Sequence, residues 1–160
     1  MMRAEEERYV IGVISDTHGL MRASVLDALR GVDLIVHAGD IGGKEVVVGL
    51  EEIAPVRLVR GNTDVEDWSR TLPATDVVEV GEHRICVVHD LGTLGLDPEA
   101  AGVSVVVSGH SHKPRQVVQR GVLYFNPGSA GPRRFQLPIG VGRLVLQGRQ
   151  VRGELVRLEA

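Results

Sequence analysis

Short runs of branched apolar residues alternate with glycine-containing polar segments along most of the chain. Runs such as Leu34-Ile35-Val36 and Val105-Val106-Val107 are apolar at consecutive positions, which is typical of strands buried on both faces. In two early stretches, apolar residues recur at steps of three and four, which predicts helices over 20–30 and 44–53. The predicted strands cover 9–15, 34–37, 56–59, 77–80, 84–89, 103–108, 117–119, 122–125, 141–147 and 151–158.

The order of these elements predicts an α/β architecture. The first half alternates strand and helix, as parallel βαβ units do, and the second half forms hairpins that turn at Gly81-Glu82, Arg120-Gly121 and Gly148-Arg149. Many strands with few helices favour two packed sheets flanked by helices. Because no linker, repeat or low-complexity tract interrupts the chain, we expect residues 1–160 to form one domain, with 1–8 as a disordered extension.

Composition narrows the class of protein. The chain has 160 residues, of which 43% are hydrophobic and 24% charged, which is typical of a globular domain. A net charge of −3 argues against binding of long nucleic acid. Cys86 is the only cysteine, so no internal disulfide is possible. The sequence shows neither a signal peptide nor a run long enough to span a membrane, so we expect a cytoplasmic protein.

Five of the predicted strands are followed at once by side chains that can bind metal ions. Because the carboxyl ends of strands form the sites of open α/β sheets, we expect these side chains to converge. Several stand beside a glycine, which lets backbone segments approach closely. The residues concerned are Asp16, His18, Asp40, Asn62, His89, His110 and His112.

The types of these seven side chains indicate the chemistry. They comprise two carboxylates, one amide and four imidazoles, and the missing thiolates disfavour zinc-finger and iron–sulfur sites. A mixed nitrogen and oxygen set suits Mn, Fe, Co, Ni or Zn. Asp16 and His18 are two residues apart, as are His110 and His112, so each pair can reach one ion. Asp residues are also common in turns, but the ordered set favours ligands.

These motifs, in this order, resemble those of the calcineurin-like metallophosphoesterase superfamily. The resemblance covers residues 10–130 and rests on D-x-H at Asp16-Thr17-His18, G-D at Gly39-Asp40, G-N-x-[DE] at Gly61-Asn62-Thr63-Asp64, a lone His at His89 and G-H-x-H at Gly109-His110-Ser111-His112. Asn126-Pro127-Gly128-Ser129 follows, as in the small bacterial and archaeal phosphodiesterase branch. The fold implied by the resemblance is a four-layer α/β/β/α sandwich.

The resemblance also implies a reaction and a set of roles. Two divalent ions are implied per chain, Mn being favoured over Ni, Co, Fe or Zn, and a hydroxide shared by them would attack phosphorus in a small phosphodiester. Asp40, Asn62 and His89 are the implied catalytic residues. The first ion would be held by Asp16, His18 and His112, the second by Asn62, His89 and His110, and Asp40 would bridge them. Relatives in this branch form dimers or tetramers, so a homo-oligomer is a further expectation.

Two positions depart from the family pattern. Thr63 stands where many members carry a His that protonates the leaving group, and a hydroxyl is a poor general acid at neutral pH. This departure favours good leaving groups or strained cyclic esters. Asp90 replaces the Gly that commonly follows the lone His, and the segment that follows is short, so Asp97-Pro98 is expected to cap only a brief turn.

Other residues are expected to support the site or to contact the substrate. His37 is expected to form a hydrogen bond beside the ligands, and Asp64 to orient its loop. Thr63 and Arg133 are candidates for contacts with the substrate phosphate, although Arg133 and the arginine after it could also form a solvated patch. His83, at a predicted hairpin turn, is expected to be solvated.

Two other classes of function stay open at this point. Within the same chemistry, the chain could be a phosphomonoesterase, a cyclic-nucleotide phosphodiesterase or a nuclease, although a nuclease would need a basic track. Outside enzymology, a retromer subunit of this superfamily has the same fold and serves as a protein-interaction scaffold with an impaired metal site. Retention of all seven ligand positions disfavours the scaffold.

Overall fold

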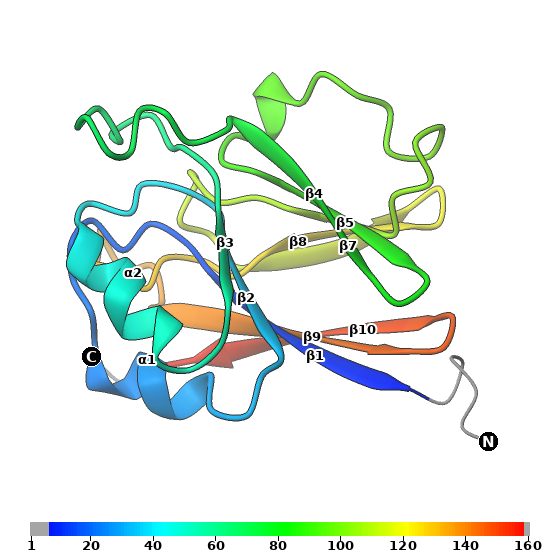
Figure 1. Ribbon diagram of the computed structural model, residues 1–160, viewed down its shortest axis with the longest axis horizontal. Coiled ribbons are helices and arrows are strands. Elements are labelled where there is room, and N and C mark those ends of the chain that lie inside the picture. Colours follow the sequence, from blue (N-terminus) through cyan, green and yellow to red (C-terminus); the bar gives the residue numbers. More distant parts are fainter. Residues whose placement is uncertain (1–6, 159–160) are drawn as a thin grey trace.

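The computed structural model describes residues 7–158, which form two stacked mixed sheets of five strands each (Figure 1). The first sheet has the order β10-β9-β1-β2-β3. Its strands are β1 (Arg8–Ile14), β2 (Leu34–His37), β3 (Val56–Leu58), β9 (Gly140–Gln147) and β10 (Gln150–Arg157). Strands β1, β2 and β3 are parallel, as the βαβ pattern predicts, and β9 and β10 form an antiparallel hairpin beside β1.

The second sheet contains the other two predicted hairpins. Its order is β4-β5-β6-β8-β7. The strands are β4 (Thr75–Val80), β5 (His83–Val88), β6 (Val105–Val107), β7 (Arg115–Gln119) and β8 (Val122–Asn126). β5, β6 and β8 run parallel in the centre, with β4 and β7 antiparallel at the edges. Both sheets therefore have central parallel strands whose carboxyl ends can carry a site.

In the part of the chain that the structure describes, both α-helices lie on the outer face of the first sheet. α1 (Ala23–Ala28) and α2 (Lys44–Glu51) bury Val25, Val46 and Leu50 against it. Over the second sheet lies a short 3-10 turn, η2 (Leu91–Thr93), whose following loop packs Leu94 and Leu96 on the sheet. The predicted α/β sandwich of two mixed sheets is confirmed, and its fourth layer is this turn and loop because the segment that follows β5 is short.

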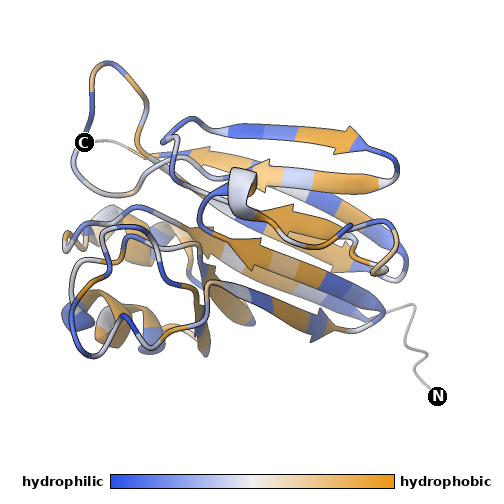
Figure 2. Cartoon of the chain, turned by 90° about the horizontal axis from the view of Figure 1, so that it is seen from above, coloured by the Kyte–Doolittle hydropathy of each residue, from blue (hydrophilic) through white to orange (hydrophobic). Residues whose placement is uncertain are grey.

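A hydrophobic core lies between the sheets, where apolar side chains from both inner faces meet. Orange hydrophobic segments accordingly dominate the strand centres in Figure 2. The fully buried members include Ile11, Val36, Ile85 and Leu144. Burial of apolar surface stabilises a fold by roughly 25 cal/mol per Å². Because this layer packs the two sheets together, it fixes the positions of their strand ends relative to one another.

Most element bounds lie within two residues of those predicted from the sequence. The exception is the first helix, predicted over 20–30 and observed as Ala23–Ala28. Arg22 just before it has extended backbone, with φ −83° and ψ 142°. Its guanidinium donates hydrogen bonds to the Ala130 and Gly131 carbonyls at 3.2 and 3.0 Å. This tertiary contact holds the chain out of the helix before Ala23.

The predicted disordered extension falls mostly on residues 1–6, which lie outside the described residues. At its end the prediction is wrong, because Arg8 belongs to β1 and pairs with Gln147 of the long strand β9. Within residues 7–158, no helix is long and apolar enough to cross a membrane.

His83 corrects a second prediction, since it is buried rather than solvated. Its Nδ1 lies 2.8 Å from Ser104 Oγ and its Nε2 lies 2.8 Å from the Gly148 carbonyl oxygen. The carbonyl can only accept, so the ring proton is on Nε2 and the Ser104 hydroxyl donates to Nδ1. His83 thus ties β5 of one sheet to the β9–β10 turn of the other.

His37, the last residue of β2, ties together the loops that follow β1 and β2. The Gly39 N–H donates to His37 Nδ1 at 3.0 Å, which leaves the ring proton on Nε2. Nε2 therefore donates to Thr17 Oγ1 at 3.0 Å, and the Thr17 hydroxyl donates to the Ile41 carbonyl at 2.7 Å. The imidazole is fully buried, and both of its nitrogens form hydrogen bonds while the ring stays neutral.

Phe125 of β8 fills the space between the sheets and requires glycine opposite it. A Cβ at Gly142 of β9 would lie 2.3 Å from the Phe125 ring, and one at Gly153 of β10 would lie 2.8 Å from it. The ring is 1% exposed, so it has no open direction in which to move. These glycines let an aromatic ring lie flat on the first sheet.

Replacing Gly142 with Ala is expected to lower the free energy of unfolding by about 1–3 kcal/mol, through overpacking against Phe125. The matched control is Gly95→Ala, because a Cβ at Gly95 meets nothing within 4 Å. Urea unfolding of both variants measures the difference. Adding Phe125→Leu to Gly142→Ala should recover part of the loss, and strictly additive losses would contradict the clash.

Replacing His37 with Gln is expected to weaken the pH dependence of stability. Burial is the main cause that lowers the pKa of His37 to about 3, against 6.5 when unfolded. Between those values the unfolded chain binds more protons, so the contribution of His37 is complete above pH 6.5 and is lost as pH falls. From pH 7 to 5.5 the metal-free wild type should lose about 1 kcal/mol more than His37→Gln in urea unfolding. Equal losses would contradict the neutral buried ring.

Candidate metal centre

The loops that follow β1, β2, β3, β5 and β6 meet at one end of the sandwich and carry all seven predicted ligands. The first two loops run side by side, since the Asp16 and His18 N–H groups donate to the Gly39 and Asp40 carbonyls at 3.0 Å. The loop that follows β6 joins the loop that follows β5 through a hydrogen bond from the Gly109 N–H to the His89 carbonyl. The site therefore straddles both sheets.

Asp16 uses its two carboxylate oxygens differently. Oδ2 accepts hydrogen bonds from Ser15 Oγ at 2.6 Å and from the His110 N–H at 3.1 Å. Oδ1 is buried and has no hydrogen-bond partner. Around it lie the Nε2 atoms of His112 at 3.3 Å, of His89 at 3.9 Å and of His18 at 4.0 Å. One oxygen anchors the side chain, and the other faces the imidazoles.

Asp40 repeats this division. Its Oδ1 accepts from the Thr63 N–H at 2.9 Å. Its Oδ2 lies 3.3 Å from His89 Nε2 and 3.8 Å from His18 Nε2. The second oxygen of Asp40 therefore lies close to two imidazoles, one from the loop that follows β5 and one from the loop that follows β1.

Asp64 binds the loop that carries Asp40 through hydrogen bonds to backbone N–H groups. Its carboxylate accepts from the N–H groups of Asp40 at 2.8 Å, Ile41 at 3.0 Å, Gly42 at 3.4 Å and Gly61 at 2.8 Å. The carboxylate is thus surrounded by backbone donors and has no oxygen directed at the imidazoles. Its position is that of a residue which orients two loops.

His89 has a tautomer that the surrounding atoms determine. Its Nδ1 lies 2.8 Å from the Ala38 carbonyl oxygen, so Nδ1 carries the proton of the neutral ring. In that neutral ring, Nε2 presents a lone pair to two oxygen acceptors, Asn62 Oδ1 at 2.9 Å and Asp40 Oδ2 at 3.3 Å, and His110 Nδ1 lies 3.3 Å from it. Such an arrangement is repulsive unless a proton or a cation lies among the acceptors.

The four histidines form two pairs. The ring centroids of His18 and His112 lie 5.6 Å apart, and those of His89 and His110 lie 5.1 Å apart. Among the side chains of residues 7–158, the buried nitrogen and oxygen atoms without a hydrogen-bond partner are Asp16 Oδ1, His18 Nε2 and His112 Nδ1. Ligand atoms of Asp16, His18 and His112 lie within 4.8 Å of one another, as do those of Asp16, Asp40 and His89.

These unpaired atoms test whether a cation fits the site. Buried polar atoms ordinarily find partners, and orphaned ones require an explanation. Here the orphaned atoms are carboxylate oxygen and imidazole nitrogen, which bind divalent cations. The donor set therefore fits divalent metal ions.

Charge within the site follows the same geometry. Burial raises the pKa of Asp40, but hydrogen bonds from His89 and the Thr63 N–H outweigh burial and hold that pKa far below its usual range. Burial lowers the pKa of His89, whereas the Asp40 and Asp16 carboxylates raise it, with a net upward shift. Burial, opposed by Asp16 and assisted by Arg134, lowers the pKa of His112. A proton therefore favours His89 over His112.

Five of the seven side chains stand on strained backbone. Non-glycine residues rarely adopt positive φ, and each instance costs of order 1–3 kcal/mol. Within residues 7–158, the only other non-glycine residues with positive φ are Arg120 and Phe135. The five are Asp16 (57°), His18 (45°), Asp40 (59°), His110 (70°) and His112 (64°).

Glycines keep the space beside the carboxylates open. A Cβ at Gly61 would lie 2.1 Å from Asp40 Oδ1, and one at Gly109 would lie 2.6 Å from Asp16 Oδ2. One at Gly39 would lie 2.8 Å from His89 Nδ1. The glycines of the three motifs thus permit the close approach that their neighbours need.

The predicted substrate contacts differ in position. Thr63 is exposed next to Asn62, at the rim of the site. Arg133 and Arg134 are both exposed, but it is Arg134 whose charge reaches His112 and lowers its pKa. The arginine nearer the site is therefore the neighbour of the one selected from sequence.

Sequence reasoning missed some residues that hold the ligands. Ser15 is one, although its place directly before Asp16 could have indicated a contact. The second is Arg22, whose contacts to Ala130 and Gly131 had no signal in the pattern.

Asn126 donates to the Gly109 carbonyl at 3.0 Å, and the Ser129 hydroxyl donates to the Asp16 carbonyl at 3.0 Å, so the Asn-Pro-Gly-Ser segment borders the site.

Comparison with known proteins shows the family to which the chain belongs. The family model of the calcineurin-like phosphoesterase superfamily domain matches residues 10–149. A relative from Methanothermobacter thermautotrophicus, named as a probable metallophosphoesterase, is 35% identical over 94% of each chain.

Solved structures have the same fold. A conserved protein from Streptococcus pneumoniae, described as a predicted phosphoesterase, is 26% identical with a TM-score of 0.68, covering 88% of this chain and 84% of that one. Vps29 from Chaetomium thermophilum is 21% identical with a TM-score of 0.76, covering 94% of this chain and 97% of that one. By its sequence, its fold and its convergent metal-binding side chains, the chain belongs to the calcineurin-like phosphoesterase superfamily.

Proposed function

We propose that this protein is a phosphodiesterase that acts on small substrates with two divalent cations bound at the strand ends. The observation that carries the proposal is the set of facing acceptors around Asp16 Oδ1, Asp40 Oδ2 and His89 Nε2. When His89 is neutral, the lone pairs of these atoms face one another, and a bound cation turns this repulsion into binding.

We assign the ligands in two groups. Asp16, His18 and His112 hold the first ion, and Asn62, His89 and His110 hold the second. Asp40 bridges them, and its support is that Oδ2 lies within 4 Å of an imidazole from each group. Two dications against two carboxylates leave about +2 of local charge, which attracts phosphate despite the acidic chain.

The bound ions would supply charge neutralisation on the phosphate oxygens and a water of lowered pKa. The chain's own residues hold this arrangement in place. The Ala38 carbonyl fixes the tautomer and the plane of His89, and Asp64 fixes the loops of Asp40 and Asn62. Asn62 and His110 form the exposed rim, where a phosphate enters.

Diesters are the favoured substrates for two reasons. Thr63 cannot protonate a poor leaving group as an imidazole can. A monoester also carries an extra negative charge that needs a cationic partner, and Arg134 is exposed rather than held in the site. Manganese is our choice of metal, with Ni, Co, Fe or Zn as alternatives. The homo-oligomer and the cytoplasmic location stay predictions.

The scaffold alternative rests on the likeness to Vps29, which at 21% identity concerns the fold alone. The presence of metal-binding side chains at all seven ligand positions favours an enzyme. Metal-stripped protein reloaded separately with Mn, Ni, Co or Zn should hydrolyse 4-nitrophenyl diesters faster than 4-nitrophenyl phosphate. A metal-free, inactive protein would favour the scaffold, and a strong preference for the monoester would contradict the phosphodiesterase.

Asp40→Asn is expected to lower kcat by at least about a hundredfold, because the amide loses the charge that bridges two cations. The Thr63 N–H retains an acceptor in the amide oxygen, so the melting temperature without metal should change little. Asp67→Asn is the control, since Asp67 is exposed and pairs only with Arg70 in the described structure. Full activity in Asp40→Asn would contradict the bridging role.

Metal binding is expected to release protons near and below neutral pH. Because the Asp40 and Asp16 carboxylates raise the pKa of His89, its Nε2 holds a proton more firmly than a free imidazole does, and the metal must displace that proton. Calorimetric titration with Mn²⁺ in buffers of different ionisation enthalpy should show proton release that diminishes as the pH rises from slightly acidic to alkaline values. Apparent affinity should rise over the same interval, and a pH-independent affinity would contradict ligation by His89.

A further inference from the structure

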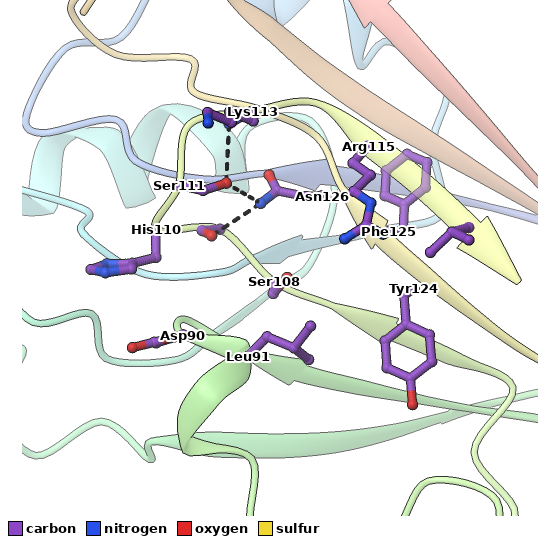
Figure 3. A pocket seen from close by; sticks show the side chains of 12 residues that line it. Asp90, Leu91, Ser108, His110, Ser111, Lys113, Arg115, Tyr124, Phe125 and Asn126 are labelled. Atoms are coloured by element: carbon purple, nitrogen blue, oxygen red, sulfur yellow. Dashed lines mark hydrogen bonds between the residues drawn. The ribbon is translucent and has the colours of Figure 1, made fainter. Parts of the chain in front are cut away.

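A pocket of about 310 Å³ opens beside His110, on the outer face of the second sheet. It lies between the turn η2 and strands β7 and β8, and it is drawn in Figure 3. His110 belongs both to this pocket and to the metal centre, where its Nδ1 lies 3.3 Å from His89 Nε2. A phosphate bound at the metal centre can therefore direct one ester arm into the pocket.

The two walls of the pocket differ in chemistry. Figure 3 shows Leu91 and Tyr124 on one side and Arg115 and Asn126 on the other. Asn126 is fixed, because its amide donates to the Gly109 carbonyl and its Oδ1 accepts from the Gly128 N–H at 2.9 Å. An apolar wall opposite a planar guanidinium suits a flat group, which can contact both.

Charge gives the pocket a direction. Asp90 lies at the end next to His110, and its carboxylate points toward that end in Figure 3. Lys113 and Arg115 line other parts of the pocket, and neither forms an ion pair with another residue among 7–158. An acidic group near Asp90 would be repelled, whereas one beside Arg115 would gain charge-assisted hydrogen bonds.

We infer that this pocket binds the leaving arm of the phosphodiester, and that the preferred arm is an aromatic ring with an acidic group distal to the scissile bond. Leu91 and Tyr124 contact the ring, and Arg115, assisted by Lys113, binds the acidic group. Asp90 excludes arms whose acid lies next to the phosphate. The inference rests on the proposed phosphodiesterase function and names the substrate class for it.

Three methyl aryl phosphates test the inference with the manganese-loaded full chain. The aryl arms are 4-carboxyphenyl, its neutral analogue 4-carbamoylphenyl, and 2-carboxyphenyl. Arg115→Gln should lower kcat/KM for the 4-carboxyphenyl diester by about tenfold, mostly through KM, and leave the carbamoyl diester within about twofold. Because each ratio compares one substrate in two proteins, differences between leaving groups cancel. Lys113→Gln should give a smaller loss in the same direction.

Arg149→Gln is the matched control, since Arg149 is exposed in the β9–β10 turn. It should leave all three rates unchanged, and the wild type should turn over the 2-carboxyphenyl diester most slowly. If Arg115→Gln alters both 4-substituted diesters equally, or neither, the inference is overturned while hydrolysis by the wild type still supports the phosphodiesterase. If the manganese-loaded wild type hydrolyses none of the diesters, the proposed function fails and the inference with it.

Discussion

Mutual repulsion among buried lone pairs is the constraint on which the rest of this structure depends. Asp16 Oδ1, Asp40 Oδ2 and Nε2 of His89 face one another, and their lone pairs repel unless a proton or a cation lies among them. Each side chain is held there through its other end, by Ser15, by the Thr63 N–H and by the Ala38 carbonyl respectively. In each side chain, one polar atom forms a hydrogen bond that holds the other polar atom close to further lone pairs, where electrostatic repulsion acts on it. A bound cation reverses the sign of the interaction.

The rigid sandwich makes this arrangement tenable. Five ligand residues adopt positive φ, and unstrained alternatives would turn their side chains away. The core between the sheets holds the strand ends in place, and His37 and Asp64 connect the loops that leave them. Glycines at 39, 61 and 109 admit the carboxylates and the imidazole where any Cβ would collide with them. Stability contributed by the apolar layers therefore offsets strain that is concentrated at one end.

Much of this could be predicted from sequence because the signals were local. Apolar runs predicted the ten strands, apolar residues at steps of three and four predicted the two helices, and polar residues just past five of the strands predicted the side chains that converge. Local patterns failed where a distant contact decides. Arg22 shortens the first helix by reaching Ala130, and His83 is buried because Ser104 and Gly148 come to it from other elements. The pocket formed by Leu91, Arg115 and Tyr124 joins three segments that no spacing rule connects.

The claim that these side chains bind two cations is tested most directly by locating the bound cations in a crystal. Crystals grown with manganese and measured with anomalous diffraction should show two peaks on either side of the Asp40 carboxylate, one beside His18 and His112 and the other beside His89 and His110. Retained positive φ at the five strained residues would accompany them. Side chains turned outward, with no anomalous peak near Asp40 at saturating manganese, would contradict the account.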